Sequence, residues 1–223
     1  MGWPKPRLRG LPKALFPRAG AKGPDFSLTT TKGDTVTTPK SRTWPLAEAR
    51  EVAEELITLL RPACERIEVA GSVRRRKDQV GDIELLCISK VLSDLDFFGK
   101  STDYAILDKM LVGIIGDGLL DYRLNRKGSR AFGPLNKLLV HRPSGIGVDI
   151  FSTTAENWGL SLLVRTGSRS FNIKVMTRFR SLGMQGHAYG GVTDQHGRDL
   201  ACPTEEEVFR ILQWPFVAPE QRV

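Results

Sequence analysis

Apolar residues recur every three or four positions in the first patterned segment of the chain, which spans residues 46–60. This spacing gathers the apolar side chains on one face, so it predicts an amphipathic helix that Pro62 terminates. The residues of this face are Leu46, Ala49, Val52, Ala53, Leu56, Leu59 and Leu60.

Shorter apolar runs predict strands at 67–70, 82–89, 137–141 and 148–151. The run at 82–89 is continuously apolar from Leu85 to Ile88, as expected for a buried strand. A Pro-Ser-Gly sequence at 143–145 separates the last two strands, which predicts a hairpin between them.

Helical spacing predicts four more helices. One lies at 104–116, and the other three lie in the last third of the chain, at about 154–163, 169–182 and 204–213. Two Thr-x-x-Glu sequences, Thr153 with Glu156 and Thr204 with Glu207, have the spacing of a helix-capping box. Strands and helices mix without a regular alternation, so we expect an α+β fold with a mixed sheet and a small, mainly helical C-terminal part.

Residues 1–43 show no such periodicity and account for most of the net positive charge. The whole chain has a formal charge of +8, whereas this segment has nine basic and two acidic residues and six of the thirteen prolines. An unpaired basic arm attracts polyanions, so nucleic acid is the first partner to expect. The residues predicted to contact DNA are Lys5, Arg7, Arg9, Lys13, Arg18 and Lys22. A solvated tail or a transit peptide would fit the same composition.

Composition excludes several classes of protein. No apolar run is long enough to cross a membrane, and the N-terminus lacks the apolar core of a secretion signal. Cys64, Cys87 and Cys202 are odd in number and widely spaced, which fits neither a disulfide framework nor a Cys-x-x-Cys zinc site. We therefore expect a soluble intracellular protein, in the cytoplasm or nucleoid, or in the nucleus if the source is eukaryotic.

The residues that follow the strand at 67–70 suit a phosphate group. Gly71 allows a close turn, and Ser72 opens a potential short helix whose free N–H groups favour an anion. Arg74, Arg75 and Arg76 follow directly and can bind phosphate oxygens in pairs.

Three carboxylates interrupt apolar strands. Asp82 and Glu84 are two residues apart, so both side chains leave the same face of the strand; alone, this pair would also fit the wet face of an edge strand. Asp149 interrupts the apolar run 147–151, where an unpaired carboxylate is costly and needs a cation. If the two strands are neighbours, the three carboxylates converge and suit a two-metal site with Mg²⁺.

These features together resemble the nucleotidyltransferases of the DNA polymerase beta type, the family X DNA polymerases. Residues 71–86, GSVRRRKDQVGDIELL, are similar to the family's Gly-Ser, paired-arginine and Gly-Asp-x-Asp signature, and Asp149 resembles its third catalytic aspartate. Residues 165–172, RTGSRSFN, resemble its Tyr-Phe-Thr-Gly-Ser-x-x-Phe-Asn motif, and residues 204–219 resemble the end of its thumb. The resemblance runs from about residue 42 to the end.

The resemblance implies a catalytic palm at 44–152, a thumb at 153–223, and two Mg²⁺ ions, for which Mn²⁺ can substitute. Asp82, Glu84 and Asp149 would be the catalytic metal ligands, with Asp149 nearest the primer 3′-hydroxyl. The family also implies a cis peptide bond between Gly167 and Ser168. The nucleotide contacts that it implies are Gly71, Ser72, Arg75, Gly81, Thr166, Gly167, Ser168, Phe171 and Asn172.

Three positions depart from the family pattern. Glu84 stands where aspartate is usual, and Val164-Arg165 replaces an aromatic pair under the sugar, so we expect weak discrimination against ribonucleotides. Gly147 replaces an arginine beside the third aspartate, which removes a local positive charge. Nothing before residue 42 resembles the family's lyase domain or DNA clamps, so the basic arm is expected to supply part of the grip on DNA.

The sequence therefore predicts a monomeric DNA-directed DNA polymerase that adds a dNTP to the 3′-hydroxyl of primer–template or gapped DNA. The resemblance implies short-gap filling in DNA repair. Two alternatives stay open: a template-independent nucleotidyltransferase acting on DNA or RNA ends, and a catalytically silent DNA-binding protein on a polymerase frame. Glu84 is the residue that motivates the silent alternative.

Overall fold

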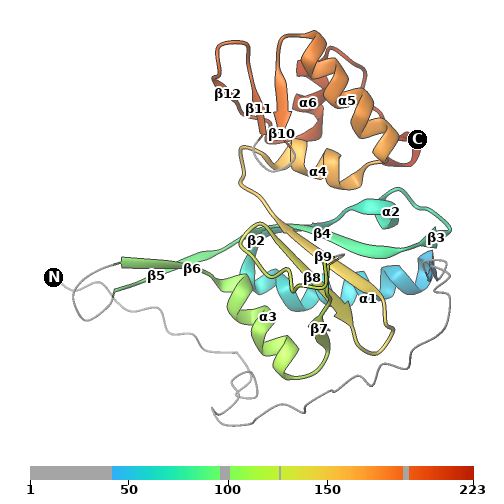
Figure 1. The fold of residues 1–223 in the computed structure, drawn as a ribbon, viewed down its shortest axis with the longest axis vertical. Helices are drawn as coiled ribbons and strands as arrows, with labels where there is room; N and C mark the ends of the chain where they lie inside the picture. Colours follow the sequence, from blue (N-terminus) through green and yellow to red (C-terminus); the bar gives the residue numbers. More distant parts are fainter. Residues whose placement is uncertain (1–41, 96–100, 126, 188–190) are drawn as a thin grey trace.

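The computed structural model describes residues 42–95, 101–125, 127–187 and 191–223, arranged in two bodies that Figure 1 shows one above the other. The lower body is called the palm here and the upper body the thumb. The palm consists of β1 (Trp44–Pro45), α1 (Leu46–Leu60), a 3-10 turn (Arg61–Ala63), β2 (Cys64–Val69), α2 (Gly71–Arg74), β3 (Gln79–Val80), β4 (Asp82–Ser89), β5 (Val91–Leu95), β6 (Ser101–Ala105), α3 (Ile106–Gly116), β7 (Leu120–Tyr122), β8 (Asn136–His141) and β9 (Gly147–Ser152). The thumb consists of α4 (Trp158–Thr166), α5 (Arg169–Ser181), β10 (Gln185–His187), β11 (Gly191–Thr193), β12 (Asp199–Leu200), α6 (Glu205–Leu212) and a final 3-10 turn (Pro219–Gln221).

The main sheet of the palm has five strands in the order β2-β4-β9-β8-β7. Strands β4 and β9 are parallel, and the other neighbouring pairs are antiparallel. The antiparallel pairing of β8 with β9 confirms the hairpin that the turn at 143–145 predicts. This mixed sheet with its helices confirms the α+β class.

Strand alternation divides the palm into two faces. On one face, Ile83, Leu85 and Ile150 join the large buried cluster that α1 and α3 complete. On the other face, Leu86 and Phe151 pack against the first helix of the thumb, α4, in a smaller buried cluster. Because side chains alternate along a strand, even-numbered β4 residues and odd-numbered β9 residues face the thumb. Asp82, Glu84 and Asp149 belong to those two sets.

The first predicted helix is confirmed in its bounds, but of its predicted apolar face Leu59 is 40% exposed and Leu46 is only partly buried. Helix α1 runs from Leu46 to Leu60, follows Pro45, and gives way at Pro62 to a 3-10 turn. Its buried residues fall at the predicted helical spacing and are Ala49, Val52, Ala53, Leu56 and Leu60.

The predicted helix at 154–163 begins later, and its capping box is wrong. Helix α4 starts at Trp158 after Asn157, which makes no side-chain cap hydrogen bond. Thr153 instead extends the sheet, because its N–H donates to Cys87 O at 3.0 Å. In the second predicted capping box, the threonine caps the helix as expected. Thr204 Oγ1 accepts a hydrogen bond from Glu207 N at 3.2 Å at the start of α6.

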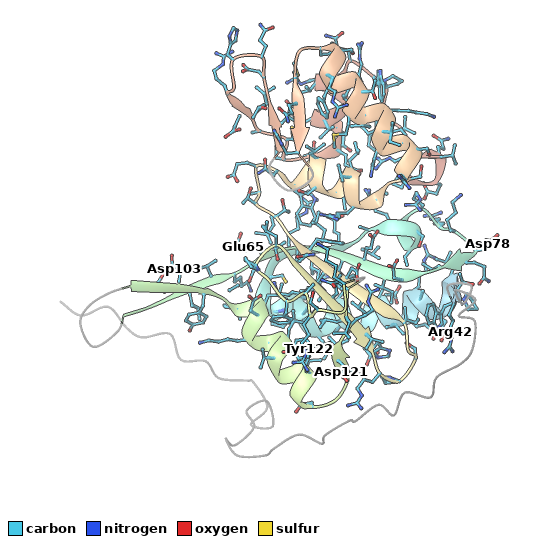
Figure 2. All side chains as sticks on the ribbon, in the orientation of Figure 1. Arg42, Glu65, Asp78, Asp103, Asp121 and Tyr122 are labelled. Carbon is cyan, nitrogen blue, oxygen red and sulfur yellow. The ribbon has the colours of Figure 1, made fainter. Side chains whose placement is uncertain are left out.

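The pattern predicts neither the β5–β6 hairpin nor the small thumb sheet. The hairpin projects from the palm, with Asp103 well out along it in Figure 2. Its Val91 and Leu92 are 57% and 50% exposed, so apolar residues there do not mark a buried face. Strands β10, β11 and β12 contain three, three and two residues, too few for an alternation to be recognised.

A buried ion-pair cluster joins the palm to the thumb. Glu205, at the start of α6, accepts hydrogen bonds from Arg74 of α2 at 2.8 Å from both terminal nitrogens. It also accepts from Arg222, near the C-terminus, at 2.6 and 3.1 Å. Arg74 donates in addition to Thr166 Oγ1 at 2.8 Å. These contacts hold α2, which precedes the carboxylate strand, against the thumb.

Candidate active site

The register of the two parallel strands places the three carboxylates together on the thumb side of the palm. Glu84 of β4 lies beside Asp149 of β9, and Asp82 lies beside Gly147. Their strand neighbours Ile83 and Val148 are fully buried toward the other face. The sequence predicts that the three carboxylates converge if the two strands are neighbours, and the strands are neighbours.

Burial and mutual repulsion disfavour the charged forms of these carboxylates. Burial raises the pKa of Glu84 to about 8, with further contributions from Asp82 and Asp149 that outweigh the opposing Arg165 and Arg75. Burial likewise raises the pKa of Asp82 and of Asp149, and in both cases Arg123 opposes that rise. A cation bound at the three carboxylates would favour their charged forms.

The donor chemistry of the site fits a hard divalent cation. Three carboxylates supply only oxygen ligands, which Mg²⁺ and Mn²⁺ prefer, and a cation would relieve their repulsion. The fit lies in the donor set and not in a preformed cage. Within the described part of the chain, no three His, Cys, Asp or Glu side chains are already arranged to hold a metal ion.

Gly71 makes room for the longer side chain of Glu84. A Cβ at residue 71 would lie 2.2 Å from Glu84 Oε2, and the backbone there has φ +62°, which favours glycine. The glutamate that replaces the usual aspartate is thus accommodated by the glycine that opens α2.

A cavity of about 580 Å³ separates the carboxylates from the thumb. The palm contributes Ser72, Arg75, Asp82 and Glu84 to its lining. The thumb contributes Val164, Arg165, Gly167, Arg169, Asn172, Ile173, Met176, Thr177 and Arg180. Carboxylates on one wall face arginines on the other, so the cavity can accept an anion that carries cations with it, such as a metal-bound polyphosphate.

Of the nine predicted nucleotide contacts, Ser72, Arg75, Gly167 and Asn172 line this cavity. Asn172 is held in place because its Nδ2 donates to Val164 O at 2.7 Å. Arg75 also donates to the carbonyl of Thr166, which ties the palm arginine to the thumb turn. The peptide bond between Gly167 and the next residue is cis, as the resemblance implies.

The other predicted contacts lie elsewhere, and their nucleotide roles stay predictions. Thr166 is fully buried with its hydroxyl on Arg74, and Ser168 Oγ caps α5 by accepting from Phe171 N at 3.2 Å. Phe171 packs in the thumb core, 6.3 Å from Phe209 between ring centroids. Gly71 lies against Glu84, and Gly81 has open space where a Cβ would be.

Sequence reasoning missed two arginines that act on the carboxylates. Arg123, directly after β7, donates to Asp149 Oδ1. It therefore supplies beside Asp149 the positive charge that the sequence lacks at Gly147. Arg165 stacks on Phe151 with its guanidinium carbon 3.7 Å from the ring centroid. Arg165 was noted as a departure from the family, whereas no local pattern marks Arg123.

The predicted DNA contacts Lys5, Arg7, Arg9, Lys13, Arg18 and Lys22 lie outside the described residues. Across the residues that the structure does describe, no helix has both the length and the apolar character needed to span a membrane.

A comparison with known protein families finds a match in the C-terminal part of the chain. Residues 161–223, which include α4 from Ser161, α5, α6 and the small sheet, match the DNA polymerase beta thumb. Such a domain implies DNA binding and a polymerase-like function for the part of the chain that contains it. Residues 161–223 are therefore similar to a DNA polymerase beta thumb, a match that supports a family X polymerase-like protein.

Proposed function

We propose that the protein is a DNA-directed DNA polymerase that adds a dNTP to a primer 3′-hydroxyl by two-metal nucleotidyl transfer. The observation that carries the proposal is the parallel register that sets Glu84 beside Asp149, with Asp82 next in line, at a cavity walled by a polymerase beta thumb. Short-gap filling during repair is the role we propose for it, with the protein acting as a monomer.

The residues divide into metal-holding and nucleotide-holding groups. Asp82, Glu84 and Asp149 would hold two Mg²⁺ ions, which supply charge neutralisation for the attacking and leaving oxygens. Asp149 would face the primer 3′-oxygen as that oxygen bonds to the α-phosphorus and pyrophosphate leaves. Separately, Ser72 and Arg75 would bind the leaving phosphates.

Two thumb arginines would extend the phosphate-binding wall. Arg169 and Arg180 line the same cavity as Arg75, and guanidinium groups bind phosphate oxygens in pairs. Asn172 and Ile173 lie on the same wall and would contact the sugar and base. The absence of an aromatic side chain at 164 and 165 leaves the sugar filter to Val164 and Arg165.

The test is single-nucleotide extension of a labelled, one-nucleotide-gapped duplex in the presence of Mg²⁺, with each dNTP and each rNTP offered separately. Addition of the complementary dNTP alone supports the proposal. Addition of any base favours the template-independent transferase, and no addition with Mg²⁺ or Mn²⁺ favours the silent DNA-binding protein. Ribonucleotide uptake would show that Val164 and Arg165 do not exclude the 2′-hydroxyl.

Glu84→Asp separates an active enzyme from a silent one. In an active enzyme, the shorter carboxylate should be tolerated or should shift the preference between Mg²⁺ and Mn²⁺. In a silent protein, the variant should stay inactive or gain activity. The comparison needs the wild type and the variant on the same gapped duplex.

We further propose that the basic arm supplies part of the grip on DNA. Each phosphate neutralised by lysine or arginine releases counterions and steepens the salt dependence of binding. Deletion of residues 1–41 should therefore weaken duplex binding and flatten its salt slope. A full-length variant with Lys5, Arg7, Arg9, Lys13, Arg18 and Lys22 changed to glutamine separates charge from length. Unchanged affinity and slope in both would contradict this role.

A further inference from the structure

The absence of a side chain at Gly147 opens a route to the carboxylates. A Cβ built at this residue would lie 3.4 Å from both Cζ and Nε of Arg123 and 3.6 Å from Asp82 Cβ. A Cβ there would be in ordinary van der Waals contact with the guanidinium of Arg123, so only a side chain longer than that of alanine would compete for its space. Gly147 has ordinary backbone geometry, so its value here is its small size and not its freedom of conformation.

Arg123 approaches from the edge of the sheet. It follows β7, the strand at the edge of the order β2-β4-β9-β8-β7, and its own N–H donates to Leu138 O of β8 at 3.0 Å. The backbone anchor lies one strand away from β9, and the long side chain spans that distance. Its Nη2 then donates to Asp149 Oδ1.

The contact is sheltered on the carboxylate side and leaves Arg123 with unused bonding capacity. The Asp149 side chain is 14% exposed, against 37% for that of Arg123. Nε of Arg123 is buried and has no hydrogen-bond partner among the described residues. The same guanidinium thus lies against β9 beside Asp82 while bonding to Asp149.

We infer that Arg123 is a positioning residue for Asp149, and that Gly147 is the residue that gives it access. The inference rests on the proposed polymerase function. Arg123 orients the Asp149 carboxylate and holds it away from Glu84, while its positive charge competes with a metal ion for the same oxygens. Hydrogen-bond partners of metal-binding carboxylates commonly tune activity in this way.

Arg123→Ala should slow nucleotide addition and tighten metal binding at the same time. We expect kcat to fall about 10- to 100-fold, with the KM for dNTP little changed, because the orienting hydrogen bond is lost. Binding of Mn²⁺ alone, followed by electron paramagnetic resonance without DNA or nucleotide, should tighten about 3-fold or more because a nearby positive charge is gone. General damage to the site would lower both kcat and the affinity for Mn²⁺. A lower kcat together with a higher Mn²⁺ affinity therefore identifies a positioning role.

A relocated arginine provides the rescue test. Residues 147 and 149 are two apart on β9, so a side chain at 147 begins on the same face as Asp149. Arg123→Ala combined with Gly147→Arg should return both the rate and the Mn²⁺ affinity toward wild type. Arg130→Ala is the matched control, because Arg130 stacks on Tyr122 at 4.6 Å instead of bonding to a carboxylate, and it should change neither.

Each outcome bears on the inference. Slower addition with tighter Mn²⁺ binding, reversed by the relocated arginine, supports it. An unchanged rate, unchanged or weaker Mn²⁺ binding in Arg123→Ala, or failure of the double variant to move either value overturns it. A wild type that adds no nucleotide overturns the proposed function instead, which the same wild-type assay reveals separately.

Discussion

Two buried glutamates, Glu205 at the palm–thumb junction and Glu84 in the candidate active site, have opposite surroundings. Burial by itself would raise the pKa of Glu205, but hydrogen bonds from Arg74 and Arg222 outweigh it and hold that pKa below its usual range. Around Glu84, two neighbouring aspartates add to the effect of burial, and its pKa rises to about 8. The two glutamates differ in whether neighbouring arginines outweigh the effect of burial on the pKa: they do at Glu205 and do not at Glu84.

This difference separates a structural joint from a site with a chemical function. Glu205 receives four charge-assisted hydrogen bonds, so its charge is satisfied within the protein. Two aspartates lie near Glu84, and the arginines around them do not offset the rise of its pKa. Buried charge that the chain leaves uncompensated is a common property of functional sites, because a ligand or ion completes it.

The largest expected effect is on catalysis at the carboxylate-rich site. Asp82→Ala and Asp149→Ala should each lower the rate of single-nucleotide addition at least ~10³-fold, or about 4 kcal/mol of activation free energy, because in the proposed mechanism each removes a metal ligand. Asp82→Ala should not lower the free energy of unfolding, since it relieves repulsion, whereas Asp149→Ala also removes the ion pair with Arg123. Asp103→Ala, on the projecting hairpin (Figure 2), is the control and should retain the wild-type rate. A loss of less than tenfold in either variant would mean that the carboxylates do not act as a set.

The next effect is on stability at the arginine-rich joint. Glu205→Gln keeps the shape of the side chain but leaves Arg74 and Arg222 without their carboxylate, which should lower the free energy of unfolding by about 3–5 kcal/mol. Urea denaturation measures it. Glu207→Gln, on the same helix but in the exposed pair with Arg210, should change stability little. Equal losses in the two variants would remove the distinction between a joint and a surface pair.

Opposite pH dependences should sharpen the comparison further. The folded pKa of Glu205 lies below its ordinary value of 4.5, so its stabilisation is present above that pH and is lost as the pH falls through the folded pKa. The folded pKa of Glu84 is about 8, so the folded state binds more protons than the unfolded state between about 4.5 and 8. Its contribution to stability therefore declines as the pH rises through that range.

Urea denaturation across pH, without divalent cations, measures both slopes. Glu205→Gln should remove the loss on the acid side, and Glu84→Gln should remove the decline between about pH 4.5 and 8. A Glu84→Gln variant that keeps the full decline would show that other groups cause it.

The smallest effect is expected for Glu84→Gln at pH 7. With a pKa of about 8, Glu84 is mostly protonated at that pH in the metal-free protein, and glutamine has nearly the same shape. The free energy of unfolding should change by no more than about 0.5 kcal/mol, in contrast to Glu205→Gln. A loss as large as that of Glu205→Gln would mean that Glu84 is satisfied internally after all.

Local pattern was enough to predict elements whose burial follows a single period. The helix at 46–60 is present as expected because its apolar residues lie on one face. The strand at 82–89 is present because its apolar residues form one continuous, largely buried run. The motif residues Ser72, Arg75, Gly167 and Asn172 also gather at one cavity. The pattern failed where burial is not periodic, as at the exposed hairpin β5–β6 and the two- and three-residue strands of the thumb.

The sequence by itself thus determined the α+β class, the major helices and the three carboxylates with the residues Ser72 and Arg75 that line their cavity. Tertiary structure alone decided which arginine serves which carboxylate. Arg74 lies within the motif that was predicted to bind phosphate, yet it bonds to Glu205, 131 residues away. Arg123 reaches from the edge of the sheet to Asp149, past Gly147. Periodicity reports only which face of an element is buried. The pairing of charges across a fold depends on strand register and on the space that neighbouring side chains leave, which no local pattern contains.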